Sequence, residues 1–442
     1  MSTFGFAFTL ASAPAFDPVV ATNEYLAKIP PEAMAKSIAY NTGNHWLMLW
    51  GFLFSSAIYL ILLSTGLSAR MLHAAERITG ARTNDGVATG KRTWLVPLFY
   101  TAQFFVLNTL IQFPLTAYTG FFREHQYGMS NLTFAGWLAD EGKDFGLSFI
   151  ILSLGSILLY AVLRRVGRSW WIWTTALLIA FYALGAMVAP VYIAPMFNKY
   201  TRLENPVLRD QLISIARANQ IPADDIYVVD ASRQTKRVSA NVSGLFGTTR
   251  ISLNDNLLNR CSPAAVRGVM AHEMGHYVLN HLVKSLVQFS LVIGIGLACV
   301  AWAFSILLRR RGNSWGIRTA PDPALVNAVP LRRQPGIGVA DPAALPLVLL
   351  LFGIYSLLTT PLTNTIIRTQ ETEADAFGLN AGREPDGMSE ALLLLVEYRN
   401  PKPGKWEEIL FFDHPSGYNR ILAAMTWKAE HLSEVTQPPV PK

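Results

Sequence analysis

The sequence has few charged residues and few cysteines, and each scarcity excludes a class of protein. Lys, Arg, Asp and Glu together make up 15% of the 442 residues, whereas soluble globular chains average about 25%. The two cysteines, Cys261 and Cys299, form neither a disulfide framework nor a CxxC pair. An ordinary soluble chain and a disulfide-stabilised secreted domain are therefore both excluded.

Apolar residues are abundant instead. They make up 51% of the chain, and the mean hydropathy is +0.28. Six apolar runs are long enough to cross about 30 Å of hydrocarbon, and tryptophans lie near several of their ends, as interfacial aromatics do. The sequence thus predicts an integral, multi-pass membrane protein. The predicted spans are 46–66, 94–119, 145–163, 170–192, 283–308 and 345–367.

The excess of basic residues indicates contact with a membrane rather than with nucleic acid. The net charge is +7 and the pI is near 9.3. Lys and Arg cluster at the ends of the apolar runs, where such residues set topology and contact anionic headgroups. No nucleic-acid recognition motif is present. We therefore predict membrane lipid as a partner and no nucleic acid.

The same charges predict an orientation. Loops 67–93, 164–169 and 309–344, which six spans would place on one side, carry fourteen Lys and Arg residues. The short loop 120–144, on the other side, carries two basic residues against four acidic ones. By the positive-inside rule the basic side is cytoplasmic. The two larger polar regions, which follow the fourth and sixth spans, are then predicted to be non-cytoplasmic.

A short segment in the second half of the chain has the spacing of a metal site. Ser262 and Pro263 are typical of an N-cap and a first helical residue, so a helix is expected to begin there. On this helix His272 and His276 share one face and can bind one metal ion. Glu273 lies roughly 100° further round, where it can hold a water rather than the ion. This is the H-E-x-x-H arrangement of zinc hydrolases.

A catalytic zinc also needs a third protein ligand and one open position. The acidic segment after the last apolar run supplies candidates. If that helix continues, Glu371 and Asp375 share a face, while Glu373 points elsewhere. We predict Glu371 as the third ligand and Asp375 as the carboxylate that accepts the other N–H of a ligating histidine. Glu373 is the rival ligand, and the predicted cofactor is one Zn²⁺ per chain.

Further along, His414 and Arg420 lie in a turn-rich segment. A cationic or hydrogen-bonding group close to the metal would stabilise the oxyanion of a tetrahedral intermediate, so both are candidate catalytic residues. The other histidines are interpreted as ordinary surface or core residues. His281 is among them, because it follows His276 by five positions and would lie off the ligand face of a continuous helix. The others are His45, His73, His125 and His431.

The predicted fold class is mainly α: a polytopic membrane helical bundle with a small α/β metalloprotease insertion and a C-terminal helical segment. Within the insertion, the pattern predicts a helix over 205–219 and strands over 226–230, 237–242 and 249–253. The predicted divisions are an N-terminal segment 1–45, four transmembrane helices in 46–192, an α/β peptidase unit 193–282, a transmembrane helix 283–308, a flexible basic and Pro-rich loop 309–344, a transmembrane helix 345–367, a C-terminal catalytic helical segment 368–436 and a disordered tail 437–442.

The motifs together resemble one known family. E-H-Q-Y-G-M-S at 124–130 and Y-I-A-P-M-F-N-K-Y-T at 192–201 precede H-E-M-G-H, E-x-x-A-D and H-P. In this order they are similar to the type I CAAX prenyl endopeptidases, integral-membrane zinc metallopeptidases of the gluzincin group, and to their bacterial relatives. The resemblance covers roughly residues 46–425.

The resemblance implies a zinc endopeptidase built into the membrane. It implies Glu371 as a metal ligand and places His414 and Arg420 around the substrate or the intermediate. It also implies that one strand pairs with the substrate backbone. That strand reads S-A-N-V-S where the family tends towards S-N-A-Y, and eukaryotic members face the cytosol, whereas the loop charges here predict the opposite side. The predicted substrate-binding residues are Ala240, Asn241, Val242 and Ser243.

We therefore predict hydrolysis of peptide bonds by a metal-activated water with Glu273 as general base. The substrate would be a peptide or protein, with or without a lipid. One alternative is a general membrane-protein quality-control protease without prenyl specificity. Outside enzymes, the alternatives are a transporter and a catalytically inactive scaffold. The membrane would be the inner or plasma membrane of a bacterium, or the endoplasmic reticulum membrane of a eukaryote.

Overall fold

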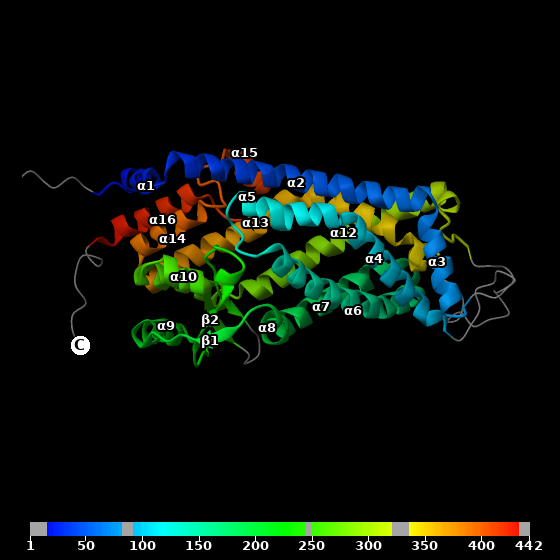
Figure 1. Cartoon of the computed structure of the whole chain (residues 1–442), viewed down its shortest axis with the longest axis horizontal. Coiled ribbons are helices and arrows are strands. Elements are labelled where there is room, and N and C mark those ends of the chain that lie inside the picture. Colours follow the sequence, from blue (N-terminus) through cyan, green and yellow to red (C-terminus); the bar gives the residue numbers. More distant parts are fainter. Residues whose placement is uncertain (1–15, 82–91, 244–248, 321–335, 433–442) are drawn as a thin grey trace, which may run out of the picture.

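The computed structural model describes residues 16–81, 92–243, 249–320 and 336–432. Long helices lie side by side along the longest axis of the molecule (Figure 1). A small sheet and several shorter helices gather at one end, and helix α3 (Leu67–Ile78) lies at the other. The predicted fold class is confirmed: the chain is a mainly α membrane bundle with a small α/β unit.

The long helices carry the predicted apolar runs. Five helical stretches are long and apolar enough to cross a membrane. One of them, Phe134–Phe197, contains two of the predicted runs, because α6 and α7 are joined only by the short turn η3 (Gly167–Ser169). A helix satisfies its own backbone hydrogen bonds, which a membrane core requires. The long helices are α2 (Pro31–Ser64), α4 (Val96–Ala117), α6 (Phe134–Val166), α7 (Trp170–Val188), α12 (His281–Arg311) and α13 (Leu345–Gly382).

The outward faces of these helices are apolar. Large hydrophobic side chains are exposed along the bundle, as lipid contact requires and water would penalise. Buried polar side chains lie instead between helices: the Ser68 hydroxyl lies 2.7 Å from that of Tyr100 and donates to the carbonyl of Ala343. The most exposed apolar residues of the bundle include Leu110, Leu291, Trp302 and Leu358.

The α/β unit has a four-stranded sheet of order β1-β2-β4-β3. Strand β4 runs parallel to β2 and antiparallel to β3. Helix α9 (Pro206–Ala218), capped by the side chain of Asn205, and helix α11 (Pro263–Val278) pack on this sheet and form its apolar core. The three predicted strands are present, and β1 was not predicted. The strands are β1 (Tyr200–Arg202), β2 (Ile226–Val229), β3 (Ala240–Ser243) and β4 (Arg250–Asn254).

Two predicted divisions differ from the observed elements. The division at residue 45 falls inside α2, which begins at Pro31. Of the predicted loop 309–344, the part after residue 335 forms short turns in which Asp341, Ala343 and Ala344 are fully buried. The predicted tail 437–442 lies outside the described residues.

Shorter helices complete the fold. Helix α1 packs on α16 and α14, which connects the N-terminal part of the chain to its C-terminal segment. The remaining α-helices are α1 (Pro18–Ala27), α5 (Arg123–Gln126), α8 (Ala194–Phe197), α10 (Asp255–Arg260), α14 (Pro385–Leu395), α15 (Lys405–Phe411) and α16 (Gly417–Glu430).

Candidate metal centre

The helix that carries H-E-x-x-H forms where the sequence predicts it. The side chain of Ser262 accepts a hydrogen bond from the backbone N–H of Ala265, and Pro263 occupies the first turn. The helix α11 ends at Val278, however, and Asn280 adopts a left-handed conformation with φ 55° before α12 begins at His281. The metal-site helix therefore does not run directly into the next span, as a continuous apolar pattern would suggest.

Small residues bring α11 close to α13. A Cβ atom on Gly378 would lie 2.9 Å from the backbone of His272, and one on Gly275 would lie 3.2 Å from the backbone of Ala374. The first distance is too short for any Cβ atom and the second is unusually tight, so glycine at these positions allows the close approach. Because the two helices touch at these points, the acidic end of α13 lies against the histidine face of α11.

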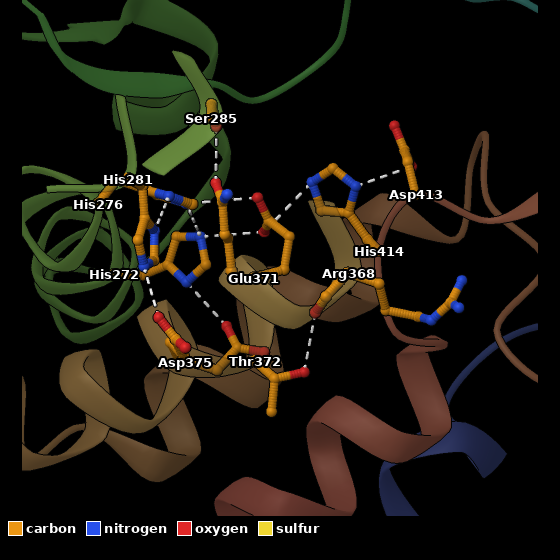
Figure 2. Close-up of polar contacts among 12 residues, drawn as sticks. His272, His276, His281, Ser285, Arg368, Glu371, Thr372, Asp375, Asp413 and His414 are labelled. Atoms are coloured by element: carbon orange, nitrogen blue, oxygen red, sulfur yellow. Dashed lines mark hydrogen bonds and ion pairs between the residues drawn. The ribbon is translucent and has the colours of Figure 1, made fainter. Parts of the chain in front are cut away.

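The predicted ligands converge at this contact. His272 Nε2 and His276 Nε2 lie 3.2 Å apart, and Glu371 oxygens lie 3.4 and 3.3 Å from them. Figure 2 shows the three side chains pointing toward one another. Zinc bonds of about 2.0–2.1 Å at tetrahedral angles require ligand atoms about 3.3 Å apart. Two imidazoles and a carboxylate at this spacing therefore fit a metal ion.

Asp375 lies directly behind His272. One of its oxygens lies 2.8 Å from His272 Nδ1, and Arg420 donates two hydrogen bonds to the same carboxylate, at 2.7 and 2.6 Å. All three residues are buried. Burial lowers the pKa of His272, but the carboxylates of Asp375 and Glu371 outweigh this and raise the pKa to about 10. Asp375 thus holds the His272 ring in orientation, and Arg420 holds Asp375.

Glu273 lies beside the ligands without being one. Its side chain lines a cavity of about 290 Å³ together with His272, His276 and Glu371. No hydrogen bond to its carboxylate is made by any residue in the described part of the chain. Burial raises the pKa of Glu273, against an opposing effect of the two histidines. A carboxylate that is unpaired and made more basic suits a general base.

His414 faces the ligands from the C-terminal segment. Its Nε2 lies 3.2 Å from Glu371, and its Nδ1 lies 2.8 Å from the carboxylate of Asp413 (Figure 2). Burial lowers the pKa of His414 despite the neighbouring carboxylate. Both His414 and Arg420 line the same cavity. Because Nδ1–H of His414 donates to Asp413, its Nε2 can donate to an oxyanion only when the ring is protonated.

A histidine that the sequence analysis set aside also belongs to this cluster. His281 Nδ1 lies 2.8 Å from His276 Nδ1, and its Nε2 lies 3.0 Å from Glu373. The same oxygen of Glu373 accepts from Lys284 Nζ at 2.6 Å. The interpretation of His281 as an ordinary surface or core residue was wrong, because it assumed a continuous helix. The left-handed turn at Asn280 restarts the helix and turns His281 back toward His276.

Glu373, the rival ligand, is accordingly absent from the convergent group of His272, His276 and Glu371. It ends a chain of contacts that runs through His281 to the far nitrogen of His276. This chain mirrors the one that Asp375 makes to His272.

Strand β3 is at the end of the sheet and next to the cavity. Ala240 lines the cavity with Val238 and Ser239, whereas Asn241, Val242 and Ser243 continue along the strand away from it. Within the described residues, β3 pairs only with β4, so its other edge can accept an extended peptide.

The segment at 124–131 ties the bundle to the α/β unit. Arg237, just before β3, donates to Glu124 and to the hydroxyl of Tyr40, each at 2.8 Å. Ser130 and Thr235 form an isolated antiparallel bridge. This motif of the sequence therefore sets the position of the strand beside the metal ligands and lies outside the cavity itself.

A helical membrane bundle with a histidine and glutamate metal centre defines an integral-membrane metallopeptidase. The chain belongs to peptidase family M48, whose model matches residues 202–428. The model described as CAAX prenyl protease N-terminal, five membrane helices, matches residues 20–199. The chain is accordingly a membrane metalloendopeptidase.

Named relatives agree with this assignment. An uncharacterized metalloprotease, YhfN, of Bacillus subtilis is 27% identical over 88% of this chain and 85% of its own length. CAAX prenyl protease 1 of Saccharomyces cerevisiae is 29% identical over 59% of this chain and 57% of its own length. The crystal structure of S. mikatae Ste24p has the same fold, with a TM-score of 0.72 and 22% identity over 92% of this chain and 95% of that chain.

Proposed function

We propose that the metal is zinc and that His272, His276 and Glu371 hold it. The convergence of these three ligand atoms beside the unpaired carboxylate of Glu273 carries the proposal. Two imidazoles and one carboxylate form a common catalytic zinc set that leaves a fourth position open. When bound, zinc polarises the peptide carbonyl and acidifies water at that open position.

The side chains around the metal then have distinct roles. Glu273 takes a proton from the attacking water and returns it to the leaving amine. His414, whose Nδ1–H is held by Asp413, donates a hydrogen bond from Nε2 to the developing oxyanion when its ring is protonated. Arg420 acts mainly through Asp375 and His272, because both of its side-chain hydrogen bonds within the described residues go to the Asp375 carboxylate.

The substrate is a peptide held extended against β3. The free edge supplies backbone hydrogen bonds to the peptide. Ala240 is the residue of β3 that lines the cavity together with the ligands. Relatives named CAAX prenyl proteases support a lipidated C-terminal peptide as the substrate class. The second candidate is proteolysis without prenyl specificity, which the similarity to the bacterial metalloprotease supports.

A peptide-cleavage assay tests this function directly. Purified protein loaded with zinc is incubated with matched peptides, prenylated and not, and the fragments are identified by mass spectrometry. Glu273→Gln should keep the metal and lower cleavage by about 10²–10⁴-fold, the usual contribution of a general base. Full activity in this variant would refute the assignment of Glu273. Equal cleavage of the two peptides would favour the second candidate.

The proposed topology has six spans, with α6 and α7 crossing separately. The positive-inside rule supports a cytoplasmic position for the Arg-rich loops, and the metal site then opens on the other side. Reporter fusions at residue 220, just after α9, and at residue 320 should report opposite sides. A cytoplasmic signal at residue 220 would reverse this orientation.

A further inference from the structure

A second cavity lies at the opposite end of the bundle from the metal centre. It has a volume of about 830 Å³ and lies between the ends of α6, α7 and α12, next to the turn η8 (Gly338–Ala340). Helix α12 connects the two ends: it begins beside the metal ligands at His281 and ends at Arg311. Its 31 residues span about 45 Å at the usual rise. The cavity is therefore separate from the peptidase site.

The polar wall of this cavity is strongly basic. Arg164, Arg168 and Arg309 line it, and no Asp or Glu is among its lining residues. Within the described ranges, no carboxylate forms an ion pair with any of the three. Asp341 follows the lining residue Ala340 in the sequence. Its carboxylate accepts hydrogen bonds from the backbone N–H groups of Arg318 and Ala343.

Of the three cavity arginines, Arg164 has a buried hydrogen-bond donor without a partner in the described part of the chain. Its Nε atom is buried and has no hydrogen-bond partner among the described residues. Its one hydrogen bond is a long contact of 3.4 Å from Nη1 to the carbonyl of Thr93. The Asp341 carboxylate attracts the Arg164 guanidinium without forming an ion pair with it, and a buried N–H donor without a partner is costly. An anion in the cavity would remove that cost.

Apart from Ser305 and Thr319, the rest of the wall is formed by apolar side chains and glycines. The cavity combines this surface with arginines located where the helices end, at the level where lipid headgroups meet acyl chains. A small inorganic anion would use only the basic part. An anionic lipid would use both parts, with its phosphate on the arginines and its glycerol and upper acyl chains on the apolar wall. The main apolar lining residues are Leu163, Trp170, Ala301, Phe304 and Leu308.

We propose that this cavity is a binding site for one anionic phospholipid, whose headgroup phosphate is held by Arg164, Arg168 and Arg309. The site is independent of the peptidase function. Three neighbouring arginines on the same helix ends, Arg165, Arg310 and Arg311, are exposed and do not line the cavity. They serve as general topology charges and provide a matched control.

Native mass spectrometry of the purified full-length protein tests the proposal. The protein is titrated with phosphatidylglycerol, with phosphatidylcholine and with inorganic phosphate. We expect one tight phosphatidylglycerol site that phosphatidylcholine does not fill. Replacing the three cavity arginines by Gln should weaken phosphatidylglycerol binding on the order of 100-fold, from the usual contribution of a basic residue near anionic lipid. The control triple replacement of Arg165, Arg310 and Arg311 by Gln should leave that site intact.

Three outcomes would overturn the proposal. Equal weakening by both triple variants would show that the binding is general surface electrostatics. Equal affinity for phosphatidylcholine would exclude recognition of the anionic headgroup. Displacement of the lipid by equimolar inorganic phosphate would assign the site to the free anion. If the cavity triple variant does not fold, the exposed Arg168→Gln variant should still weaken phosphatidylglycerol binding more than Arg165→Gln, and equal binding by these two variants would also refute the site.

Discussion

At the scale of single residues, two chains of contacts orient the histidines of the proposed metal centre. Asp375 lies behind His272, and His281 lies behind His276. In the second chain, Nδ1–H of His276 donates to Nδ1 of His281, and Nε2–H of His281 donates to Glu373. With neutral histidines, this arrangement of protons satisfies all three groups. It leaves Nε2 of His276 free for the metal.

The first prediction concerns this second chain. His281→Ala should weaken zinc affinity by about 10–100-fold, because groups behind a ligand orient it and raise its basicity. The measurement is a competition titration with a zinc chelator. His431→Ala is the control, because among the described residues the imidazole of His431 bonds only to the carbonyl of Trp427 and stacks on that indole. Wild-type zinc affinity in His281→Ala would assign His281 a purely structural role.

The second prediction uses the charge state of His272 in metal-free protein. Its pKa is raised from 6.5 to about 10, so the folded state binds a proton more tightly than the unfolded chain does. The resulting stability is fully present below pH 6.5 and is lost as the pH rises through about 10. Metal-free protein should therefore show a falling thermal midpoint across this range.

The control for this pH dependence is His272→Gln, which should lack the decline over the same range. Zinc-loaded protein should lack it too, because a ligating histidine is already deprotonated. A metal-free midpoint that stays constant from pH 6.5 to 10, the two limits of the shift, would contradict the raised pKa.

Residue spacing predicted much of this centre. Helical periodicity predicted that His272 and His276 share one face of α11 and that Glu371 and Asp375 share one face of α13, because each pair lies within one helix. Periodicity could not show His281, since its position depends on the left-handed turn at Asn280. An asparagine between two apolar stretches was the available signal, because Asn is the non-Gly residue that most readily adopts this conformation.

At the scale of elements, the centre depends on how closely α11 and α13 approach. The third prediction is that Gly378→Ala weakens zinc binding and lowers the thermal midpoint. Its Cβ would lie 2.9 Å from the backbone of His272, so α11 must move and the distance from Glu371 to the histidines must change. Zinc content by elemental analysis and thermal unfolding measure the two effects.

Gly185→Ala in α7 is the matched control. Nothing lies within 4 Å of a Cβ at Gly185, and a helical Gly→Ala exchange then stabilises by up to about 1 kcal/mol. If Gly378→Ala matched Gly185→Ala in both measurements, the close approach of the helices would not control the ligand spacing. Sequence alone did not identify Gly378, because a helical glycine has no mark that distinguishes a contact from an open surface.

At the scale of the whole molecule, composition was enough to predict a membrane bundle, and the motifs predicted a set of metal ligands whose side chains the structure brings together near one end of it. The relation between bundle and α/β unit was not predictable, since it rests on contacts between residues far apart in the chain. Two of these contacts are ion pairs: Arg237 with Glu124 at 2.8 Å, and Arg233 with Asp140 at 3.2 Å.

The fourth prediction compares these two pairs. Arg237 also donates to the hydroxyl of Tyr40 and lies three residues before β3, the strand beside the metal ligands. Arg237→Ala should therefore lower kcat/KM for a peptide about tenfold or more through misplacement of β3, with zinc content unchanged. Arg233→Ala removes an ion pair of similar exposure that lies seven residues before β3, and it should change stability by less than about 1 kcal/mol, with kcat/KM near wild type.

A double-mutant cycle separates the contact from other effects of the lost side chain. If Arg237 acts through Glu124, Glu124→Gln should lower kcat/KM as well, and the double variant should lose less than the sum of the two single losses. Additive losses would mean that Arg237 acts without Glu124, and unchanged kcat/KM in Arg237→Ala would mean that the bundle does not position the substrate strand. Because zinc stays bound in every variant of the cycle, the comparison isolates how the membrane part of the chain aligns β3 with its metal centre.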